Sequence, residues 1–580
     1  MRTPALLALF ILLFPRLFGA GNLAGFDWRL RYGDDESWAT AEPDPHTWAP
    51  VNIGISWERQ NLFNGRTAWL RSDVTVPATL QTTGLRLELM LQAERVTAFV
   101  NGREIAPTAS AGASMTIDVP SDAIRWGAVN RLALRVEGHA WTGGSSIDTV
   151  RLISRAPDAA PLDLEVRLQP ADHVFRLEEA VSFEIAVPAS VDLSTDVDLH
   201  TTVISDFHQT LHTERATIEA GTSARAVRTS LGRMAPGFYQ VIVQAAQGDA
   251  QAQRVFWFAV EPTAIVCSLN PEPDLDAYWR TAKAELAAVP PTFRVTRVPE
   301  KSTARHDVFS VEMASVDGVT LRAWYVVPVK AGRHPAVLDV PGYSAAMQPE
   351  WFMTDDDVIH LALDIRGHGR SADVLNPGFG TPGFVGHRVC EPDHYIYKGA
   401  YLDCGRALEF LRSREEVDAT RIAVAGGSQG GGLTLATAAL FPDWVACCAA
   451  GMPFLGDFRD HMKIRGVYRA EMQAHLDAQH GTWESVFRSM NLVDTAVLAD
   501  RIRCPVLMGN GLFDDDCPPH IGFSAYNRIR APKTYRIYPD EAHLLGARWQ
   551  ADSRAWLRRQ LGLDAPAPEA IHEAATAAAR

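Results

Sequence analysis

The stretch Gly426-Gly427-Ser428-Gln429-Gly430-Gly431-Gly432 decides the fold that we expect for this chain. The apolar residues 421–425 precede it as a predicted buried strand, and residues 433–440 follow with a helical pattern. Strand, G-x-S-x-G and helix in that order are the context of a nucleophile elbow. Because such a turn is tight, a side chain at 426 or 430 is expected to collide with neighbouring backbone. The pattern predicts a nucleophilic Ser428; small residues that only tighten a strand-to-helix turn are the alternative.

Two partners are expected for this serine, because α/β hydrolases carry their triad in the chain order Ser, Asp, His. Asp514 follows a late apolar run, and His543 follows the last one. A base must take the serine proton, and a carboxylate fixes the tautomer of that base. We therefore expect a triad of Ser428, Asp514 and His543. Asp515 and Asp516 are rival acids by position, and a surface loop histidine is the alternative reading of His543.

A developing oxyanion needs N–H donors, and two candidates follow from the same fold. The first is the N–H of Gln429, the residue after the nucleophile. The second comes from the loop after an early strand, residues 340–343, and we expect it to be the N–H of Tyr343. The stretch 364–369, with Arg366, follows a central strand, and we interpret its arginine as a structural tie between loops.

Length and composition limit the class of protein. The chain has 580 residues, which predicts two to four domains. It is 47% hydrophobic and 21% charged, as is typical of a soluble globular protein. The formal net charge of −14 and the lack of a long basic run argue against nucleic acid and against anionic membranes as partners.

Residues 1–21 predict a secretion signal. Arg2 supplies a positive charge, and residues 5–14 form an apolar run that is too short to span a bilayer. Small residues at 19–21 offer a cleavage region, although Phe18 departs from the A-x-A pattern. We expect a secreted or periplasmic protein without a membrane span in its mature form. An uncleaved signal anchor is the alternative.

The cysteines and histidines predict neither a disulfide framework nor a metal site. The 7 cysteines have no regular spacing, and their number is odd. No H-E-x-x-H or similar ligand spacing occurs, so we expect no metal and no cofactor. The acidic triplet 355–357 is interpreted as a solvated loop.

The first part of the chain, residues 22–157, is predicted to be all-β. Leu85, Leu87 and Leu89 alternate with polar residues, and residues 96–100 run into Asn101-Gly102, a strong hairpin turn. The region is rich in tryptophan, and we favour core packing over sugar-stacking platforms for these side chains: Trp28, Trp38, Trp48, Trp57 and Trp69.

The rest of the chain divides into two predicted domains and a tail. Residues 158–262 show short alternating strands without helical periodicity, which favours an immunoglobulin-like sandwich. Residues 268–563 alternate strands with helices, which predicts a mainly parallel sheet covered by helices. Residues 564–580 are Ala/Pro-rich and read as a loose tail. The expected fold class is therefore two N-terminal β-sandwich domains followed by a C-terminal α/β hydrolase domain.

Five pieces of the first region occur in a recognisable order: Trp48-Ala49-Pro50-Val51, Ser56-Trp57-Glu58, Gly65-Arg66-Thr67-Ala68-Trp69, Phe99-Val100-Asn101-Gly102 and Ile147-Asp148-Thr149-Val150. Together they resemble the galactose-binding-like jelly roll at the N-terminus of glycoside hydrolase family two enzymes. In those enzymes the module is often structural.

The last domain carries a more specific set: Leu275-Asp276-Ala277-Tyr278-Trp279, Arg366-Gly367-His368-Gly369, Tyr397-Lys398-Gly399-Ala400-Tyr401-Leu402-Asp403, Gly426 to Gly432, Pro453-Phe454-Leu455, and Gly511-Leu512-Phe513-Asp514 with Cys517-Pro518-Pro519. In that order the set resembles carbohydrate esterase family seven, the acetyl xylan esterases and cephalosporin C deacetylases. The resemblance implies deacetylation of small acetylated sugars and xylo-oligosaccharides without a metal, and it implies that the acid is Asp514.

Two positions depart from the family pattern, which usually has glutamine at the place of His368 and glutamate at the place of Leu544. Neither departure removes a triad member. The family also commonly forms hexameric rings, which two extra N-terminal domains would obstruct, so a homo-oligomer stays an open alternative.

We expect a secreted serine esterase that removes acetyl groups from acetylated xylan, xylo-oligosaccharides or related sugars. The alternatives are another α/β hydrolase activity, such as a prolyl-oligopeptidase-like peptidase or a glucuronoyl esterase, and a non-catalytic carbohydrate-binding protein.

Overall fold

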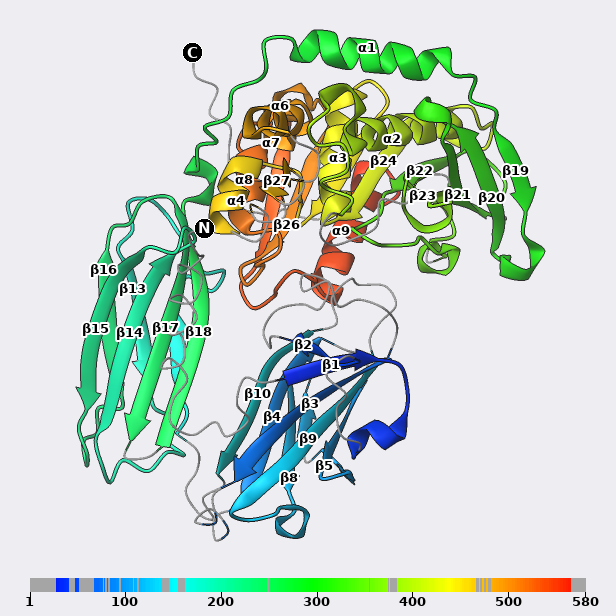
Figure 1. Ribbon diagram of the computed structural model, residues 1–580. Helices are drawn as coiled ribbons and strands as arrows, with labels where there is room; N and C mark the ends of the chain where they lie inside the picture. The colour runs from blue at the N-terminus through cyan, green and yellow to red at the C-terminus, as the bar shows by residue number, and fades with distance from the viewer. Residues whose placement is uncertain are drawn as a thin grey trace, which may run out of the picture.

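Five β-sheets organise the part of the chain that the computed structural model describes (Figure 1). The described residues are 28–40, 47–51, 67–76, 78, 81, 84–92, 95–107, 109–111, 114–137, 146–154, 162–247, 250–353, 355–373, 375, 383–465, 469, 472–473, 476–477 and 481–564. The predicted signal and nearly all of the predicted tail lie outside them. Within these ranges, no helix combines the length and the apolar character needed to cross a membrane.

The first sandwich pairs a six-stranded sheet, ordered β2-β1-β3-β9-β5-β6, with a four-stranded sheet, ordered β10-β4-β8-β7. Alternation along β4 buries Leu85, Leu87 and Leu89 in the core between them. Asn101 and Gly102 have φ of 51° and 84° and join β5 to β6 as the hairpin that was predicted. The strands are β1 Trp28–Tyr32, β2 Ala49–Val51, β3 Thr67–Val76, β4 Leu85–Gln92, β5 Arg95–Val100, β6 Arg103–Ile105, β7 Ala109–Ala111, β8 Ser114–Val119, β9 Ala128–Glu137 and β10 Ser146–Ser154.

The tryptophans of this sandwich are packed inside it. Trp28, Trp38, Trp48 and Trp69 are all buried, with exposed fractions of 9% or less. Their ring faces are therefore not available for stacking on a sugar, in agreement with the preferred interpretation. Trp57 lies outside the described residues.

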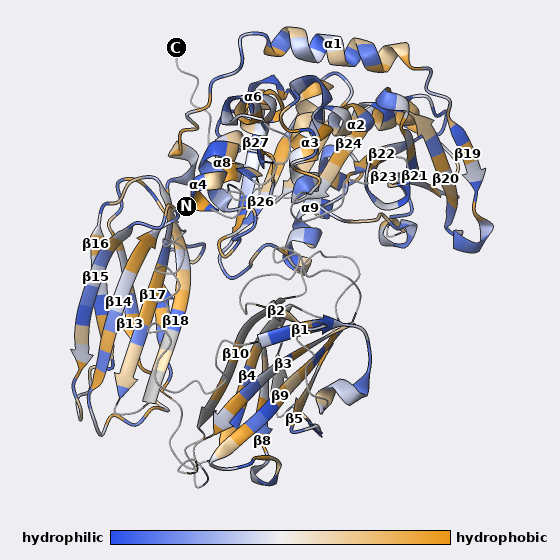
Figure 2. Ribbon diagram, viewed as in Figure 1, coloured by the Kyte–Doolittle hydropathy of each residue, from blue (hydrophilic) through white to orange (hydrophobic). Residues whose placement is uncertain are grey.

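The second sandwich pairs a three-stranded sheet, ordered β11-β13-β16, with a five-stranded sheet, ordered β12-β18-β17-β14-β15. Along β14 and β17, buried residues alternate with less buried ones, the pattern of strands with one buried face, and Figure 2 shows both hydrophilic and hydrophobic residues on the strands of this sandwich. The strands are β11 Glu165–Leu168, β12 Val174–Phe175, β13 Val181–Ala186, β14 Val197–Ser205, β15 Thr210–Ile218, β16 Ala226–Gly232, β17 Gly237–Gln247 and β18 Ala250–Val260.

The nine-stranded sheet of the last domain has the order β19-β20-β21-β23-β22-β24-β25-β26-β27. From β23 to β27 the pairing is parallel, as predicted, whereas β19, β20 and β21 form an antiparallel extension. β22 and β23 are buried at every residue, which explains the apolar runs 335–338 and 361–363 within them. The strands are β19 Arg294–Arg297, β20 His306–Ala314, β21 Thr320–Pro328, β22 His334–Asp339, β23 Ile359–Asp364, β24 Val417–Gly427, β25 Cys447–Gly451, β26 Val506–Gly511 and β27 Lys533–Tyr538.

Helices cover this sheet and connect its parallel strands. Helix α3 packs on β24 and β25, α2 packs beside α3, and α9 lies against β25 and β26. Helix α1 runs along the outside of α2 and stops before Pro290-Pro291, which cannot continue a helix (Figure 1). The helices are α1 Leu275–Ala288, α2 Ile396–Arg412, α3 Gln429–Leu440, α4 Phe458–Ile464, α6 Trp483–Val493, α7 Thr495–Leu498, α8 Pro519–Tyr526 and α9 Ala547–Gln560.

Candidate active site

One edge of the parallel sheet collects the predicted triad. Ser428 follows β24, Asp514 comes shortly after β26, and His543 comes shortly after β27. These strands run parallel through β25, so their carboxyl ends meet at the same edge. That edge is where open α/β sheets hold their ligands.

The elbow at Ser428 is as tight as the sequence predicts. Ser428 has φ of 58° and ψ of −122°, a conformation that L-residues rarely adopt. A Cβ at Gly426 would lie 2.7 Å from the carbonyl oxygen of Val340, and a Cβ at Gly430 would lie 2.5 Å from the same atom. Only glycine fits at these two positions, because the loop after β22 passes directly beside the turn. The strained serine is thereby held by its neighbours.

A continuous chain of hydrogen bonds joins the three side chains. His543 Nε2 lies 3.0 Å from Ser428 Oγ, and His543 Nδ1 lies 2.9 Å and 3.1 Å from the two carboxylate oxygens of Asp514. Asp514 Oδ1 also accepts backbone N–H groups from Asp516 at 2.9 Å and Cys517 at 2.8 Å. The carboxylate is fully buried, and its orientation is fixed from several sides.

Burial and the neighbouring charge have opposite effects on the pKa of His543 and on the pKa of Asp514. Burial lowers the pKa of His543, but the Asp514 carboxylate beside it outweighs burial and raises that pKa well above the ordinary value. Burial also raises the pKa of Asp514, while the bond to His543 and the backbone donors oppose the rise. An imidazolium at His543 is therefore well stabilised, as a general base needs after it has taken a proton.

The rival acids differ from Asp514 in what they contact. Asp515 Oδ2 accepts from Arg465 Nη1 at 2.9 Å, and its side chain is 63% exposed. Asp516 offers its carbonyl oxygen to His461 Nε2 at 3.0 Å. Of the three neighbouring carboxylates, the one within hydrogen-bond distance of His543 is Asp514.

The two loops expected to supply oxyanion donors lie side by side. Val340 N donates to the carbonyl of Ala425 at 3.0 Å, so the loop that carries Tyr343 leaves the sheet beside the elbow. Gln429 is the first residue of α3, where backbone N–H groups have no partner within the helix. A helix N-terminus also favours the negative charge that an oxyanion develops.

The side chain of Gln429 ties these loops together, a role that the sequence did not reveal. Its Oε1 accepts from the Tyr397 hydroxyl at 2.8 Å, and its Nε2 lies 3.4 Å from the carbonyl oxygen of Pro341. The same Nε2 lies 3.0 Å from His368 Nε2. Because an amide nitrogen donates, His368 accepts there and is neutral; burial lowers its pKa to about 4. His368, which stands where the family usually has glutamine, thus still provides a hydrogen-bond acceptor for Gln429.

Arg366 acts as the structural tie that we predicted. Its Nε and Nη2 each donate to Asp403 at 2.9 Å, and its Nη1 donates to Asp317 at 2.7 Å. The guanidinium is buried and lies away from the triad contacts described above.

Cys517 is a neighbour of the nucleophile for which the sequence predicted no role. Its Sγ lies 3.8 Å from Ser428 Oγ, and the side chain is buried. The two residues are far apart along the chain, so only the fold reveals the contact. Burial raises the pKa of this thiol and keeps it protonated.

The loop that carries His543 is braced against the loop of Asp514. The carbonyl of Glu541 accepts from Phe513 N at 3.0 Å, and a Cβ at Gly511 would lie 2.3 Å from that carbonyl oxygen. Glu541 Oε2 accepts from Gly546 N at 2.8 Å. Leu544, the second departure from the family, is 40% exposed. The brace on the histidine loop therefore comes from Glu541, two residues before the histidine.

Two further features lie around α4. Among the described residues, Asp457, Asp460 and His520 form a group in which one ligand atom of each side chain lies within 4.8 Å of the others. The spacing of these residues in the sequence did not predict this group.

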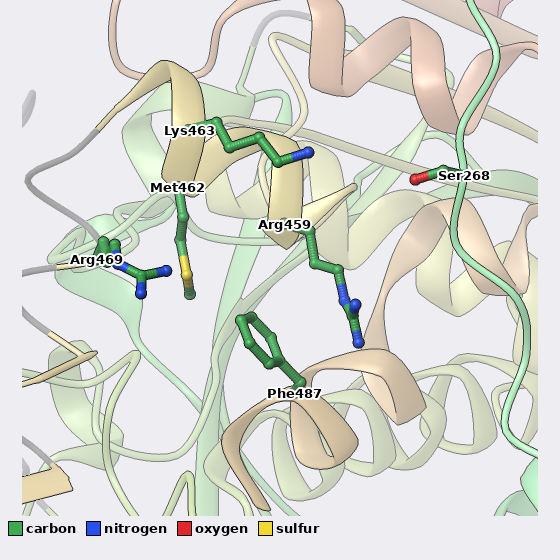
Figure 3. A pocket seen from close by; sticks show the side chains of 6 residues that line it. All are labelled: Ser268, Arg459, Met462, Lys463, Arg469 and Phe487. Atoms are coloured by element: carbon green, nitrogen blue, oxygen red, sulfur yellow. The ribbon is translucent and has the colours of Figure 1, made fainter. Parts of the chain in front are cut away.

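A pocket of about 350 Å³ opens beside the same helix (Figure 3). Figure 3 shows that cationic side chains gather around Met462 and Phe487, and the complete lining is Ser268, Arg459, Met462, Lys463, Arg469 and Phe487.

Comparisons with known proteins assign the chain to a family. Residues 267–560 match the family model described as acetyl xylan esterase (AXE1). The acetyl esterase Axe7A of Xylanibacter ruminicola is 26% identical over 412 residues, which cover 67% of this chain and 89% of that protein. This match is longer than the region of the family model, so it includes residues outside 267–560.

Two solved structures are similar to about half of the chain. The acetyl xylan esterase from Paenibacillus sp. R4 is 32% identical, covering 52% of this chain and 98% of that chain, with a TM-score of 0.48. Acetyl xylan esterase 1 from Thermoanaerobacterium sp. JW/SL YS485 is 27% identical with the same coverages and a TM-score of 0.47. The family model spans half of the chain and includes Ser428, Asp514 and His543. The chain belongs to the acetyl xylan esterase family and is a carboxylic ester hydrolase.

Proposed function

We propose that this protein is a secreted serine esterase that removes acetyl groups from acetylated xylan, xylo-oligosaccharides or related sugars through an acyl-enzyme. The observation that carries the proposal is the hydrogen-bonded series Asp514–His543–Ser428 at the carboxyl edge of the parallel sheet. Family membership supports the acetyl group as the acyl part of the ester. The resemblance in the sequence supports the sugar part.

The proposed reaction has two halves. Ser428 Oγ attacks the acetyl carbonyl carbon while its proton passes to His543 Nε2, and the N–H groups of Gln429 and Tyr343 stabilise the oxyanion. The intermediate collapses, His543 returns the proton to the leaving sugar oxygen, and an acetyl-Ser428 ester remains. A water then attacks this ester with His543 again as the base, which releases acetate and restores the serine. Asp514 holds the imidazole tautomer and stabilises its charged form throughout.

The test is acetate release by the purified full-length chain and by Ser428→Ala. We expect the wild type to release acetate from acetylated xylo-oligosaccharides and from p-nitrophenyl acetate. Ser428→Ala should fold normally and lose about a million-fold in kcat, as loss of a triad nucleophile does. Near-wild-type turnover by a folded Ser428→Ala would overturn the assignment of the nucleophile.

The same assay separates the substrate classes. The panel contains a peptide and a glucuronoyl ester in addition to the acetylated sugars. Preferred cleavage of either one over every acetyl ester would replace the proposed activity. Secretion is tested separately, by the N-terminal sequence of the protein recovered from the medium or periplasm, which should begin near residue 22.

A further inference from the structure

The second sandwich reaches the hydrolase domain through the turn between β14 and β15. His208 Nε2 in this turn donates to the carbonyl of Ile464, the last residue of α4, at 2.7 Å. Asp206 Oδ2 accepts from His520 Nδ1, near the start of α8, at 2.8 Å. The ring of Phe207 packs edge-on against the His520 ring, with centroids 5.0 Å apart. One turn of the sandwich therefore touches both α4 and α8.

These two helices flank the loop that carries Asp514. Helix α8 begins directly after Cys517 and Pro518, at the end of the loop. Helix α4 contacts the middle of the loop, because His461 Nε2 donates to the carbonyl of Asp516 at 3.0 Å. Arg465, which follows α4, pairs with Asp515 at 2.9 Å. A shift of α4 relative to α8 would therefore move the loop that orients Asp514.

His520 lies between carboxylates that belong to both domains. Its Nδ1 faces Asp206 of the sandwich, and its Nε2 lies 3.6 Å from Asp460 Oδ2 of α4. Asp457 lies in the same group, and Lys463 pairs with Asp460. Nδ1 donates to Asp206 and Nε2 faces Asp460 at ion-pair distance, so a positive charge on the imidazole is favoured from both sides of the ring. His520 thus joins Lys463 as a cation of this cluster.

The charge of the cluster supports that protonation state. Burial lowers the pKa of His520, but the bonds to Asp206 and Asp460 outweigh it and raise the pKa to about 9. All three residues are buried, with exposed fractions below 10%. Removing one partner of such a buried pair leaves an uncompensated charge, which is costly.

We propose that Asp206 and His520 are positioning residues of the esterase: the imidazolium between Asp206 and Asp460 clamps α4 to α8 and holds the Asp514 loop in its working geometry. The second sandwich thereby contributes to the active site without touching substrate. The inference rests on the proposed function, since it assigns these residues a role in the same hydrolytic site.

The experiment compares kcat on p-nitrophenyl acetate, corrected for spontaneous hydrolysis, for wild type, Asp206→Asn, His520→Gln and the double variant. Asp198→Asn is the matched control, since Asp198 is an exposed carboxylate of β14, the strand that leads into this turn, and accepts a hydrogen bond from Thr217. We expect each single variant to lose about ten- to a hundred-fold in kcat with little change in KM, because small displacements of catalytic groups have effects of that size. The double variant should be no worse than the singles, because both remove one interaction. Asp206→Glu, which restores the charge, should recover part of the loss.

A pH profile distinguishes positioning from simple loss of stability. In the wild type, kcat should fall as pH rises through about 9, where His520 loses its proton. In Asp206→Asn this fall should move to lower pH, and in His520→Gln it should be absent. A wild type with no fall in this range overturns the proposal even if the variants do not fold.

Other results also overturn it. One is a set of folded variants with lower melting temperatures but wild-type kcat and pH profile. Another is a double variant whose loss of kcat equals the product of the losses in the two single variants. A third is loss of wild-type kcat on chelation with recovery on added Zn²⁺, which would assign the Asp457, Asp460 and His520 cluster to a metal. A wild type without esterase activity would instead refute the proposed function itself.

Discussion

The two sandwiches relate differently to the hydrolase domain. The core of the first is built, among the described residues, from side chains between 28 and 152 alone. The second has its own core but also shares a cluster with the hydrolase, in which Phe238 packs against Phe523 with ring centroids 5.7 Å apart. The shared cluster consists of Val174, Phe238, Ala259, Ile265, Met508, Leu512, Phe523 and Tyr526.

Position in the chain therefore does not tell which sandwich supports the hydrolase domain. Both sandwiches precede the α/β region, and neither carries a member of the triad. Yet the second covers apolar surface of β26 and α8, the elements on either side of the Asp514 loop. Removing it exposes that surface to water, whereas removing the first leaves the shared cluster intact.

A pair of truncations gives the strongest test of the difference between the two sandwiches. Deleting residues 1–157 should leave a folded protein with wild-type kcat on p-nitrophenyl acetate. Deleting residues 1–262 should give an insoluble or inactive product, because the cluster around Phe523 loses its cover. Circular dichroism, solubility and kcat are measured for both. A soluble, fully active product of the longer deletion would show that the second sandwich is only a spacer.

Within the hydrolase domain, replacing the proposed catalytic acid, Asp514, should have the next largest effect on kcat. Asp514→Asn should lower kcat by about 10⁴-fold, because an amide favours the wrong tautomer of His543. Asp515→Asn should have a small effect, since that exposed carboxylate pairs with Arg465. If Asp515→Asn were the inactive variant and Asp514→Asn the active one, the acid would be misplaced by one residue.

The sequence predicted the residues at the sheet edge better than it predicted contacts between segments that are distant in the chain. Strand ends, the elbow glycines and the order Ser, Asp, His are local patterns, so Ser428, Asp514 and His543 could be placed by position in the chain. The bond from Gln429 to His368 and the contact of Cys517 with Ser428 join segments far apart in sequence. Periodicity and spacing carry no information about such contacts.

The same limit applies to the turn at 206–208. Asp206, Phe207 and His208 read as ordinary residues of a hairpin, and nothing local to them points to α8. Their function in the interface appears only when the sandwich is set beside the hydrolase domain, where His520 meets Asp206. The alternating pattern of residues 158–262 predicts the strands of the second sandwich but not the partners of this turn.

A matched pair of core substitutions tests the same difference between the sandwiches, with a smaller expected effect on stability. Phe238→Ala in the shared cluster should destabilise by about 3–5 kcal/mol, and Leu132→Ala in the first core by about 2–5 kcal/mol. Both side chains are fully buried. In calorimetry, Phe238→Ala should lower the transition at which esterase activity is lost, and Leu132→Ala should leave that transition in place. Equal shifts of this transition would mean that the first sandwich is coupled to the hydrolase as well.

The smallest expected effect is the dependence of the shared interface on pH. The folded pKa of His520 is raised to about 9 from an ordinary value of 6.5, because the bonds to Asp206 and Asp460 outweigh burial. A raised pKa means that the stabilisation is complete below about 6.5 and is lost as pH rises through about 9. At about 1.4 kcal/mol per pKa unit, it amounts to a few kcal/mol at most.

Melting curves of the wild type between neutral pH and pH 10 should therefore show the hydrolase transition falling on the alkaline side. His520→Gln should remove most of this fall, since glutamine does not titrate. Asp457, Asp460, Asp206 and Lys463 remain around the ring position in that variant, so the removed group is the imidazole alone. The first sandwich supplies an internal reference, because the hydrophobic cluster formed by its described residues includes no side chain of the hydrolase domain. An alkaline fall of equal size in wild type and His520→Gln would show that the interface does not depend on the charge of this histidine.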